Sequence, residues 1–207
     1  MNLNLIEASS FARIDRQLEE NDNDLSDISP AQYEIIRQVI YNTADFEYYS
    51  QLKFSEGALT QGFRALKSGL SIVVDVPEIQ VNIVPRLQQT FQNRVYCCTT
   101  TVTEIDPIKT KAALGLESLA QDRSSGIFVI GQDHFALHTL VKLIKNKTIN
   151  PSLAIATAPS LLNQNVQQYL KSASIPTIYI DSPKGGATVA SSIVNSLVNL
   201  AWIANNQ

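Results

Sequence analysis

From Ser71 onward the chain alternates short runs of β-branched and apolar residues with longer stretches of helical periodicity. The runs predict strands at Ser71–Val76, Arg94–Cys98, Gly126–Ile130, Leu153–Thr157 and Thr177–Ile180. The stretches beside them predict helices at Lys109–Gln121 (after a start at Pro107), Phe135–Lys145, Ser160–Ser172 and Ala187–Ala204. This alternation is typical of a parallel sheet with crossover helices. We therefore expect an α/β fold with a mostly parallel central sheet and helices on both faces.

The first half of the chain is mostly helical in its pattern, so we expect an N-terminal helical portion. One helix is marked by Ser29 as its cap and by Pro30 at its first position. Its expected buried face comprises Tyr33, Ile36 and Ile40, and Tyr41 directly follows that face. The last helix has an apolar stripe, which indicates packing on the sheet or on a second subunit. The stripe consists of Val189, Ile193, Leu197 and Leu200.

Length and composition favour one domain. The chain has 207 residues, of which 44% are hydrophobic, and no Pro/Gly/Ser-rich linker divides it. Such a chain is long enough to bury one substantial core. We predict a single domain over residues 1–207, with the polar segment Glu19–Ser29 as a surface loop between the first helix and the next.

The charge pattern argues against two classes of partner. The formal net charge is −3, and acidic and basic residues are mixed along the chain. No basic surface is therefore expected that would attract nucleic acid or an anionic membrane. The N-terminus lacks a basic region followed by an apolar one, and no uninterrupted apolar run approaches the ~18 residues that cross a bilayer. We expect a cytoplasmic protein.

Cysteines and histidines give only weak metal signals. Cys97 and Cys98 are neighbours with Cα atoms ~3.8 Å apart, which is closer than in a usual disulfide. We interpret them as buried thiols, with a redox or metal pair as the alternative. His134 and His138 lie four residues apart at a helix start, so with Asp133 they form either a partial metal site or a solvated helix face. Neither a cofactor nor a metal is predicted.

The turns that follow the predicted strands are candidate ligand sites, because ligands of open α/β sheets bind beyond the carboxyl ends of the strands. These turns are Asp75–Glu78, Gly131–His134, Thr157–Pro159 and Asp181–Gly186. In the last of them Lys184, Gly185 and Gly186 precede a helix, where backbone N–H groups bind anions. A simple tight turn is the alternative.

The segment around Tyr41 carries a resemblance to a known family. From Val39 to Phe46 the chain reads Val-Ile-Tyr-Asn-Thr-Ala-Asp-Phe, and Phe54–Ala58 reads Phe-Ser-Glu-Gly-Ala. These segments resemble the precorrin-8X methylmutases of cobalamin biosynthesis, which read close to Val-Ile-His-Ala-Thr-Gly-Asp-Phe and Phe-Ser-Pro-Gly-Ala. Tyr41 matches the acid/base histidine of that family.

Further segments resemble the same family in order along the chain. Ile6–Phe11 resembles Ile-Glu-x-Arg-Ser-Phe, so Ser10 matches a serine near the substrate. Thr110–Ala113 resembles Thr-Arg-Ala-Ala, with Lys111 in place of the arginine. Lysine keeps the positive charge for substrate carboxylates but loses the bidentate geometry of a guanidinium.

The strand-end turns depart further from the family pattern. Asn82 and Ser160 stand where the family has glycine, which indicates a change in the shape of the pocket because glycine allows a close ligand approach. The paired glycines before the last helix are kept as Gly185 and Gly186. The framework therefore resembles the family more closely than the ligand-facing turns do.

The resemblance implies a homodimer with its active site at the subunit interface, a tetrapyrrole substrate and a methyl shift on the macrocycle, with a histidine supplying a proton. Tyrosine has a reference pKa near ~10 against ~6.5 for histidine, so Tyr41 donates a hydrogen bond at neutral pH but shuttles a proton poorly. Tyr41 is the candidate catalytic residue, and an amphipathic filler is the alternative. The candidate substrate-binding residues are Ser10, Thr43, Asp75, Thr110, Lys111, Gly131, Lys184, Gly185 and Gly186.

Two functions compete on this basis. The first is a corrinoid-handling isomerase with Tyr41 in the place of the acid. The second is a catalytically inactive paralogue that holds a tetrapyrrole, or another protein, on the same scaffold. A further hypothesis is that His134 serves as the proton-donating acid and approaches the substrate from a different side than Tyr41.

Overall fold

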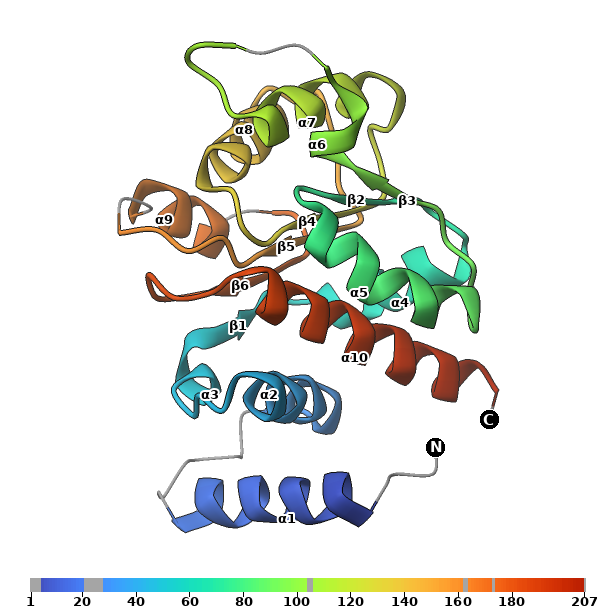
Figure 1. Cartoon of the computed structure of the whole chain (residues 1–207), viewed down its shortest axis with the longest axis vertical. Helices are drawn as coiled ribbons and strands as arrows, with labels where there is room; N and C mark the ends of the chain where they lie inside the picture. Colours follow the sequence, from blue (N-terminus) through green and yellow to red (C-terminus); the bar gives the residue numbers. More distant parts are fainter. Residues whose placement is uncertain (1–4, 21–27, 104–105, 162–163, 173, 207) are drawn as a thin grey trace.

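The computed structural model describes residues 5–20, 28–103, 106–161, 164–172 and 174–206, and these form one α/β unit (Figure 1). The strands are β1 (Leu52–Phe54), β2 (Ile72–Val74), β3 (Val95–Cys97), β4 (Ile127–Ile130), β5 (Leu153–Ala156) and β6 (Thr177–Ile180). The helices are α1 (Leu5–Glu20), α2 (Pro30–Thr43), α3 (Tyr48–Gln51), α4 (Ala58–Lys67), α5 (Pro77–Gln88), α6 (Cys98–Thr101), α7 (Lys111–Asp122), α8 (His134–Lys145), α9 (Gln164–Ser172) and α10 (Ala187–Asn205).

The six strands form one mixed sheet in the order β1-β6-β5-β4-β2-β3. β1 is antiparallel to β6, and the other neighbours are parallel. From β2 the chain moves to β3 on one side and later to β4 on the other. The direction of winding therefore reverses between β2 and β4, which is where open α/β sheets usually bind ligands.

The sheet separates two hydrophobic layers because successive side chains of a strand point to opposite faces. Val74, Val129 and Ile155 belong to the layer that contains the buried faces of α4, α5 and α10. Val73 and Phe128 belong to the layer that contains α7, α8 and α9. All residues of β2, β4, β5 and β6 are buried, as expected for strands covered on both faces.

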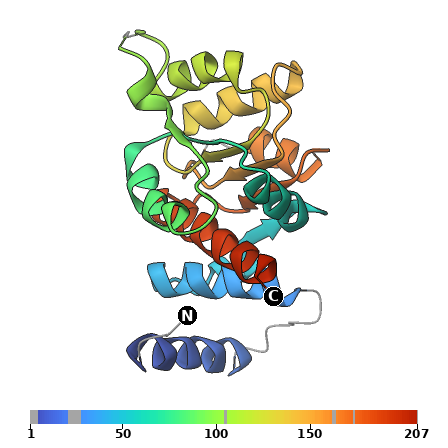
Figure 2. The same cartoon turned by 90° about the vertical axis from the view of Figure 1, so that its right-hand side faces the viewer.

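The N-terminal helices α1 and α2 add to the hydrophobic layer that contains α4, α5 and α10. α2 packs on α10, and α1 packs on α2, so α10 lies between the sheet and the N-terminal helices (Figures 1 and 2). Among the described helices, α10 alone is long and apolar enough to cross a membrane by length and composition, but more than half of that stretch is buried in the protein. Its apolar stripe packs on the sheet, as one of the two sequence alternatives proposed.

The five predicted strands and the helices of the second half are confirmed, with shifts at their ends. The predicted helix start at Pro107 is wrong, because the Thr110 side chain accepts a hydrogen bond from the N–H of Ala113 and begins α7 at Lys111. The helix expected from Ser160 begins at Gln164. Of the expected loop Glu19–Ser29, residues 21–27 lie outside the described residues.

Candidate functional site

The position of Tyr41 follows from the local structure of α2. The Ser29 hydroxyl accepts a hydrogen bond from the N–H of Gln32, whose side chain accepts one from the N–H of Ser29. This capping box and Pro30 fix the start of the helix. The helix ends at Thr43, and the residue that caps it, Ala44, has a left-handed φ of 55°. Tyr41 follows the buried face of the helix and is half-buried at its edge.

Tyr41 both packs against the core and lines a surface hollow. Its ring lies 4.9 Å from the ring of Phe11 of α1, measured between centroids. The hollow beside it has a volume of about 270 Å³. Its lining consists of Glu7, Phe11, Gln38, Tyr41, Asn42, Asn195, Ser196 and Asn199. The phenol is therefore a packing residue that also reaches an open surface.

The polar lining of this hollow is mostly uncharged. Among the described residues that line it, only Glu7 carries a charge. The Asn42 side chain donates to the Ser192 hydroxyl over 2.8 Å, and the Asn195 amide donates to the carbonyl of Asn82 over 3.1 Å. The side-chain oxygen of Asn199 accepts a hydrogen bond from the Arg86 guanidinium. These side-chain amides are held in place and offer both donors and acceptors to a ligand.

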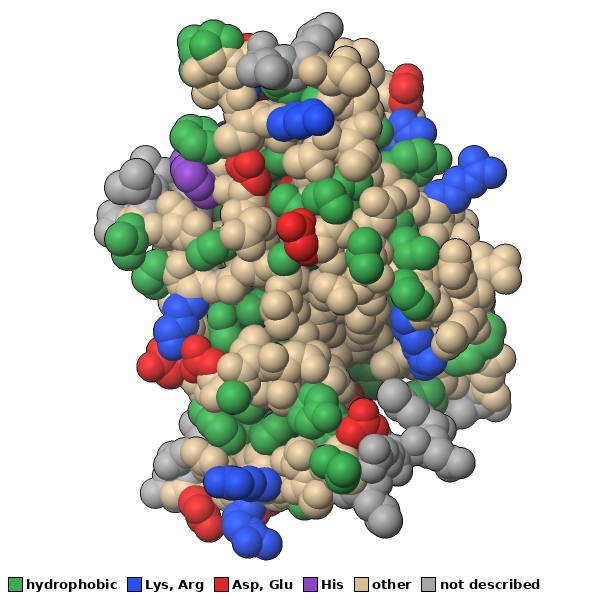
Figure 3. Space-filling model, viewed as in Figure 1, with side chains coloured by type: hydrophobic (Ala, Val, Ile, Leu, Met, Phe, Trp, Pro, Cys, Tyr) green, Lys and Arg blue, Asp and Glu red, His purple; other side chains and the backbone are tan. Residues whose placement is uncertain are grey.

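A second, more apolar hollow of about 470 Å³ adjoins the first. The two hollows share Phe11, Gln38, Ser196 and Asn199, so they form one groove between α1, α2 and α10. Pro30, Leu200 and Ile203 are among the residues that line the apolar end. Figure 3 shows hydrophobic side chains gathered over α1 and α2 on one face of the molecule. We call these two hollows together the Tyr41 groove.

Lys184 connects the turn before α10 to the turn after α2. Its ammonium lies 2.7 Å from a carboxylate oxygen of Asp45 and 2.7 Å from one of Glu47. The hydrogen bonds to Lys184 lower the pKa of both carboxyl groups, and the same bonds raise the pKa of Lys184. The cation predicted for substrate binding is thus paired with two acids of its own chain.

The paired glycines permit a close approach of two turns. Gly185 has φ of 146°, and a Cβ atom there would lie 1.9 Å from the carbonyl oxygen of Thr157. The N–H of Gly186 donates to that same oxygen over 2.8 Å. Glycine at position 185 is therefore required by packing within the chain, whatever ligand the turn meets.

Asp75 occupies the point where the winding of the sheet reverses. It is fully buried, and its carboxylate accepts hydrogen bonds from the N–H groups of Gly131, Gln132 and Asp133, at 3.0, 2.7 and 2.7 Å. Burial raises the pKa of Asp75, while the three backbone donors act in the opposite direction. The carboxylate thus ties the end of β2 to the turn after β4.

The remaining predicted residues are spread over the molecule. Ser10 lies on α1 and donates to the carbonyl of Ile6 over 2.9 Å, and Thr43 ends α2 and donates to that of Val39 over 2.8 Å. Thr110 caps α7, and Lys111 is exposed at the first position of that helix. Because α7 and α2 pack in different layers of the fold, Thr110 and Lys111 do not line the Tyr41 groove.

Neither the histidines nor the cysteines lie in this groove. His134 is half-buried at the start of α8, and His138 is exposed. Because α8 packs in the layer opposite to α2, His134 does not stand beside Tyr41. Within the described residues no group of three or more His, Cys, Asp or Glu side chains is arranged to hold a metal. Cys97 and Cys98 are free, buried thiols, as predicted.

Sequence reasoning missed the residues of α10 that line the groove. Asn195, Ser196 and Asn199 line it, and Ser192, one turn before Ser196, accepts a hydrogen bond from Asn42 of α2. These four polar residues recur at helical spacing along α10. A polar stripe on an otherwise apolar helix is a signal that a search restricted to strand-end turns does not use.

Comparisons with known proteins agree with this architecture. The profile of the precorrin-8X methylmutase (CbiC) family matches residues 5–200. The chain belongs to the precorrin-8X methylmutase family. It is 31% identical over 208 residues to a cobalt-precorrin-8 methylmutase of Synechocystis sp., covering 93% of this chain and 94% of that protein.

Two solved structures resemble the fold. A precorrin-8X methylmutase from Thermus thermophilus superposes with a TM-score of 0.81 at 27% identity, covering 98% of this chain and 99% of that one. A protein described as related to precorrin-8X methylmutase gives a TM-score of 0.77 at 24% identity, covering 92% and 99%, and this second likeness shows the fold alone. The family and the α/β architecture with a mostly parallel sheet, both expected from the sequence, are thus confirmed.

Proposed function

We propose that this protein binds a corrin precursor in the Tyr41 groove and acts as a precorrin-8X type methylmutase in cobalamin biosynthesis. The observation that carries the proposal is that the groove beside Tyr41 is open. Its polar end offers hydrogen-bonding amides, and its other end is more apolar, although the ion-paired Glu34 and Arg37 also line it. Such a combination suits a macrocycle, whose ring is largely apolar and whose ring nitrogens and substituents are polar.

Tyr41 has a definite role in this proposal. In the reaction a methyl group moves from one ring carbon to its neighbour, while an acid supplies a proton to a ring nitrogen. A well-placed general acid contributes about 10²- to 10⁴-fold in rate. A phenol is a weaker acid than an imidazolium, so it donates a hydrogen bond to the ring nitrogen but transfers its proton less readily. We therefore expect slower turnover than with histidine at this position, with binding retained.

The size of the groove supports a second part of the proposal, a homodimer. Even taken together, the hollows of about 270 and 470 Å³ remain below the roughly 1,000 Å³ that large ligand sites reach. One chain therefore encloses only part of a macrocycle, and we propose that a second copy covers the rest. We also place the protein in the cytoplasm and assign it neither a resident cofactor nor a metal.

The candidate binding residues divide by position. Ser10, Thr43, Lys184, Gly185 and Gly186 lie on α1 or where α2 ends and α10 begins. None of them lines the two hollows, so we propose that they contact parts of the ligand that extend beyond the Tyr41 groove. A carboxylate of the ligand would have to compete with two acids for Lys184. The other candidates are Asp75, Thr110, Lys111 and Gly131, and of these Asp75, Thr110 and Gly131 already have partners within the chain.

The replacement of the family's acid/base histidine by Tyr41 favours a second function, in which the protein binds its ligand without converting it. If the phenol gives no useful proton transfer, the protein holds a tetrapyrrole without converting it, as an inactive paralogue would. The same scaffold could then serve to bind another protein. Conversion of a bound macrocycle would distinguish the methylmutase from both the inactive tetrapyrrole binder and the protein-binding scaffold.

The test is incubation with precorrin-8X, and with its cobalt form, while the visible spectrum is followed. Conversion supports the isomerase, and a shifted but unconverted spectrum supports the binder. Tyr41→His should raise turnover if the groove still fits the substrate. Tyr33→His is the matched control, because Tyr33 lies on the same helix but donates to Asp15 instead. Absence of both conversion and spectral shift would overturn the small-molecule proposals.

A further inference from the structure

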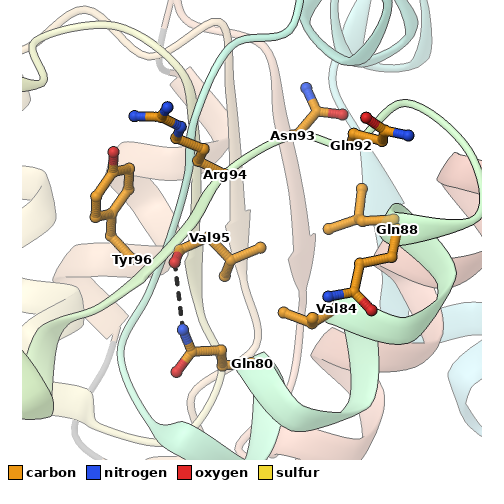
Figure 4. A pocket seen from close by; sticks show the side chains of 9 residues that line it. Gln80, Val84, Gln88, Gln92, Asn93, Arg94, Val95 and Tyr96 are labelled. Atoms are coloured by element: carbon orange, nitrogen blue, oxygen red, sulfur yellow. Dashed lines mark hydrogen bonds between the residues drawn. The ribbon is translucent and has the colours of Figure 1, made fainter.

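A second groove lies at the opposite edge of the sheet from β1, between α5 and β3. It has a volume of about 590 Å³ and shares no lining residue with the Tyr41 groove. The side chains that carry its chemistry are Gln80, Val84, Gln88, Arg94, Val95 and Tyr96. Figure 4 shows the side chains of α5 facing those of β3 across this groove.

Arg94 and Tyr96 line one end of the groove, and a second guanidinium group, that of Arg123, stacks on the Tyr96 ring beside it. Arg123, which follows α7, lies 3.7 Å above the centre of the Tyr96 ring. The guanidinium of Arg94 and the hydroxyl of Tyr96 lie side by side in Figure 4. Hydrogen bonds from Arg123 and then Arg94 lower the pKa of the Tyr96 hydroxyl. Tyr96 therefore occupies a local positive field, although the whole chain has a net charge of −3.

These two cations are poorly compensated by acids. The carboxylate of Asp122 is 3.9 Å from Arg123, at the outer limit of an ion pair, and it is the neighbouring residue in the chain. Arg94 is exposed and forms no ion pair with a described carboxylate. Lys109, Lys171 and Lys184, in contrast, each lie within 3 Å of an acid. Arg123 lies over the Tyr96 ring and Arg94 lies near its hydroxyl, and a neutral phenol is a weak substitute for an anion.

The groove beside this cluster favours a small molecule over an added β-strand. Although β3 pairs only with β2 among the described strands, the side chain of Gln80 donates to the carbonyl of Val95 over 3.2 Å. That bond uses an acceptor that an added strand would need. Val84 and Val95 provide an apolar floor, and Gln88 provides an amide at the rim.

We propose that this groove is a second ligand site, which binds a small molecule with an oxyanion head and an apolar body. The head, a carboxylate or a phosphate, would take its hydrogen bonds from Arg94 and Arg123 in place of the Tyr96 oxygen. Guanidinium groups bind both anions through paired N–H donors. The apolar body would lie over Val84 and Val95.

The test uses the full chain labelled with ¹⁵N and three probes at constant ionic strength. Inorganic phosphate and hexanoate distinguish the two kinds of head, and hexanamide has the same chain as hexanoate without its charge. We expect phosphate or hexanoate to shift the amide signals of Arg94, Val95 and Tyr96, and hexanamide to bind at least about ten-fold more weakly than hexanoate. Saturation by phosphate alone would identify a phosphate site, and tighter binding of hexanoate a carboxylate site.

Four variants connect binding to the cluster. Arg94→Gln and Arg123→Gln should each weaken binding of the better oxyanion about ten-fold. Arg64→Gln is the matched control, because Arg64 is exposed on α4 and lies outside this groove. Tyr96→Phe keeps the ring under Arg123 but frees the donors, so affinity should hold or rise. No binding of either oxyanion, detectable binding of hexanamide with the same affinity as hexanoate, or unchanged affinity in both arginine variants would overturn the proposal.

Discussion

Replacement of Asp75 by Asn is the sharpest test of how the strand-end turns are held. The two side chains have nearly the same shape, so the change removes charge and one acceptor without opening a cavity. In the parent protein one carboxylate oxygen accepts from Gly131, and the other accepts from Gln132 and Asp133. An asparagine keeps one acceptor and turns an NH₂ group toward a backbone N–H.

The expected loss of stability follows from these three hydrogen bonds. A hydrogen bond to a charged acceptor contributes about 1.5–3 kcal/mol, and a buried donor left without a partner costs about 1–3 kcal/mol. Removing a buried charge offsets part of this loss. We therefore expect Asp75→Asn to lower the free energy of unfolding by about 2–4 kcal/mol. For a chain of this length that corresponds to a fall in Tm of about 5–15 °C.

Thermal and urea unfolding at neutral pH, followed by circular dichroism, provide the measurement. The matched control is Asp133→Asn, the same chemical change two residues from Gly131. Asp133 caps α8 by accepting from the N–H of Ala136, and asparagine is an equally good N-cap, so the control should change stability by under about 0.5 kcal/mol. Equal stability of the two variants would refute the structural role assigned to Asp75.

Two more predictions concern the turn before α10. Gly185→Ala should lower the free energy of unfolding in urea by more than about 3 kcal/mol, because the new Cβ would overlap a carbonyl oxygen. Gly57→Ala, at a residue with φ of 72° and open space around it, should lower it by about 1–2 kcal/mol. Similar losses in the two variants would contradict the packing described. Lys184 lowers the pKa of Asp45 and Glu47, so its stabilisation is present above the ordinary carboxyl pKa near ~4 and is lost as the pH falls through the lowered values. The stability difference between the parent and Lys184→Met should therefore shrink in acid, and a constant difference from about pH 6 to pH 3 would contradict the ion pairs.

Strands β2 to β6 were predictable because each is a mostly apolar or β-branched run bounded by turn residues. β1 was not predicted, since Leu52–Phe54 is a three-residue edge strand without such a run. α5 contains Pro85 in its interior, which usually argues against a helix. In each case tertiary packing outweighs the local signal.

The candidate site was predictable only in part. The resemblance identified Tyr41, and the structure places that residue beside an open hollow. Its polar neighbours come from α10, and the Asn42–Ser192 bond joins residues 150 positions apart. Such a pairing has no signature in a single sequence. The partners of Lys184 were missed for the same reason, because Asp45 lies 139 residues away.

The central claim is that the Tyr41 groove binds a corrin macrocycle, and a titration followed by visible absorbance tests it most directly. The parent protein should bind a precorrin-8X type macrocycle with a spectral shift, and Tyr41→Phe, which keeps the packing on Phe11 but loses the hydroxyl, should bind about three- to ten-fold more weakly. Tyr33→Phe, the same change elsewhere on α2, should leave affinity unchanged. No binding by the parent, or equal affinity of all three proteins, would contradict the account.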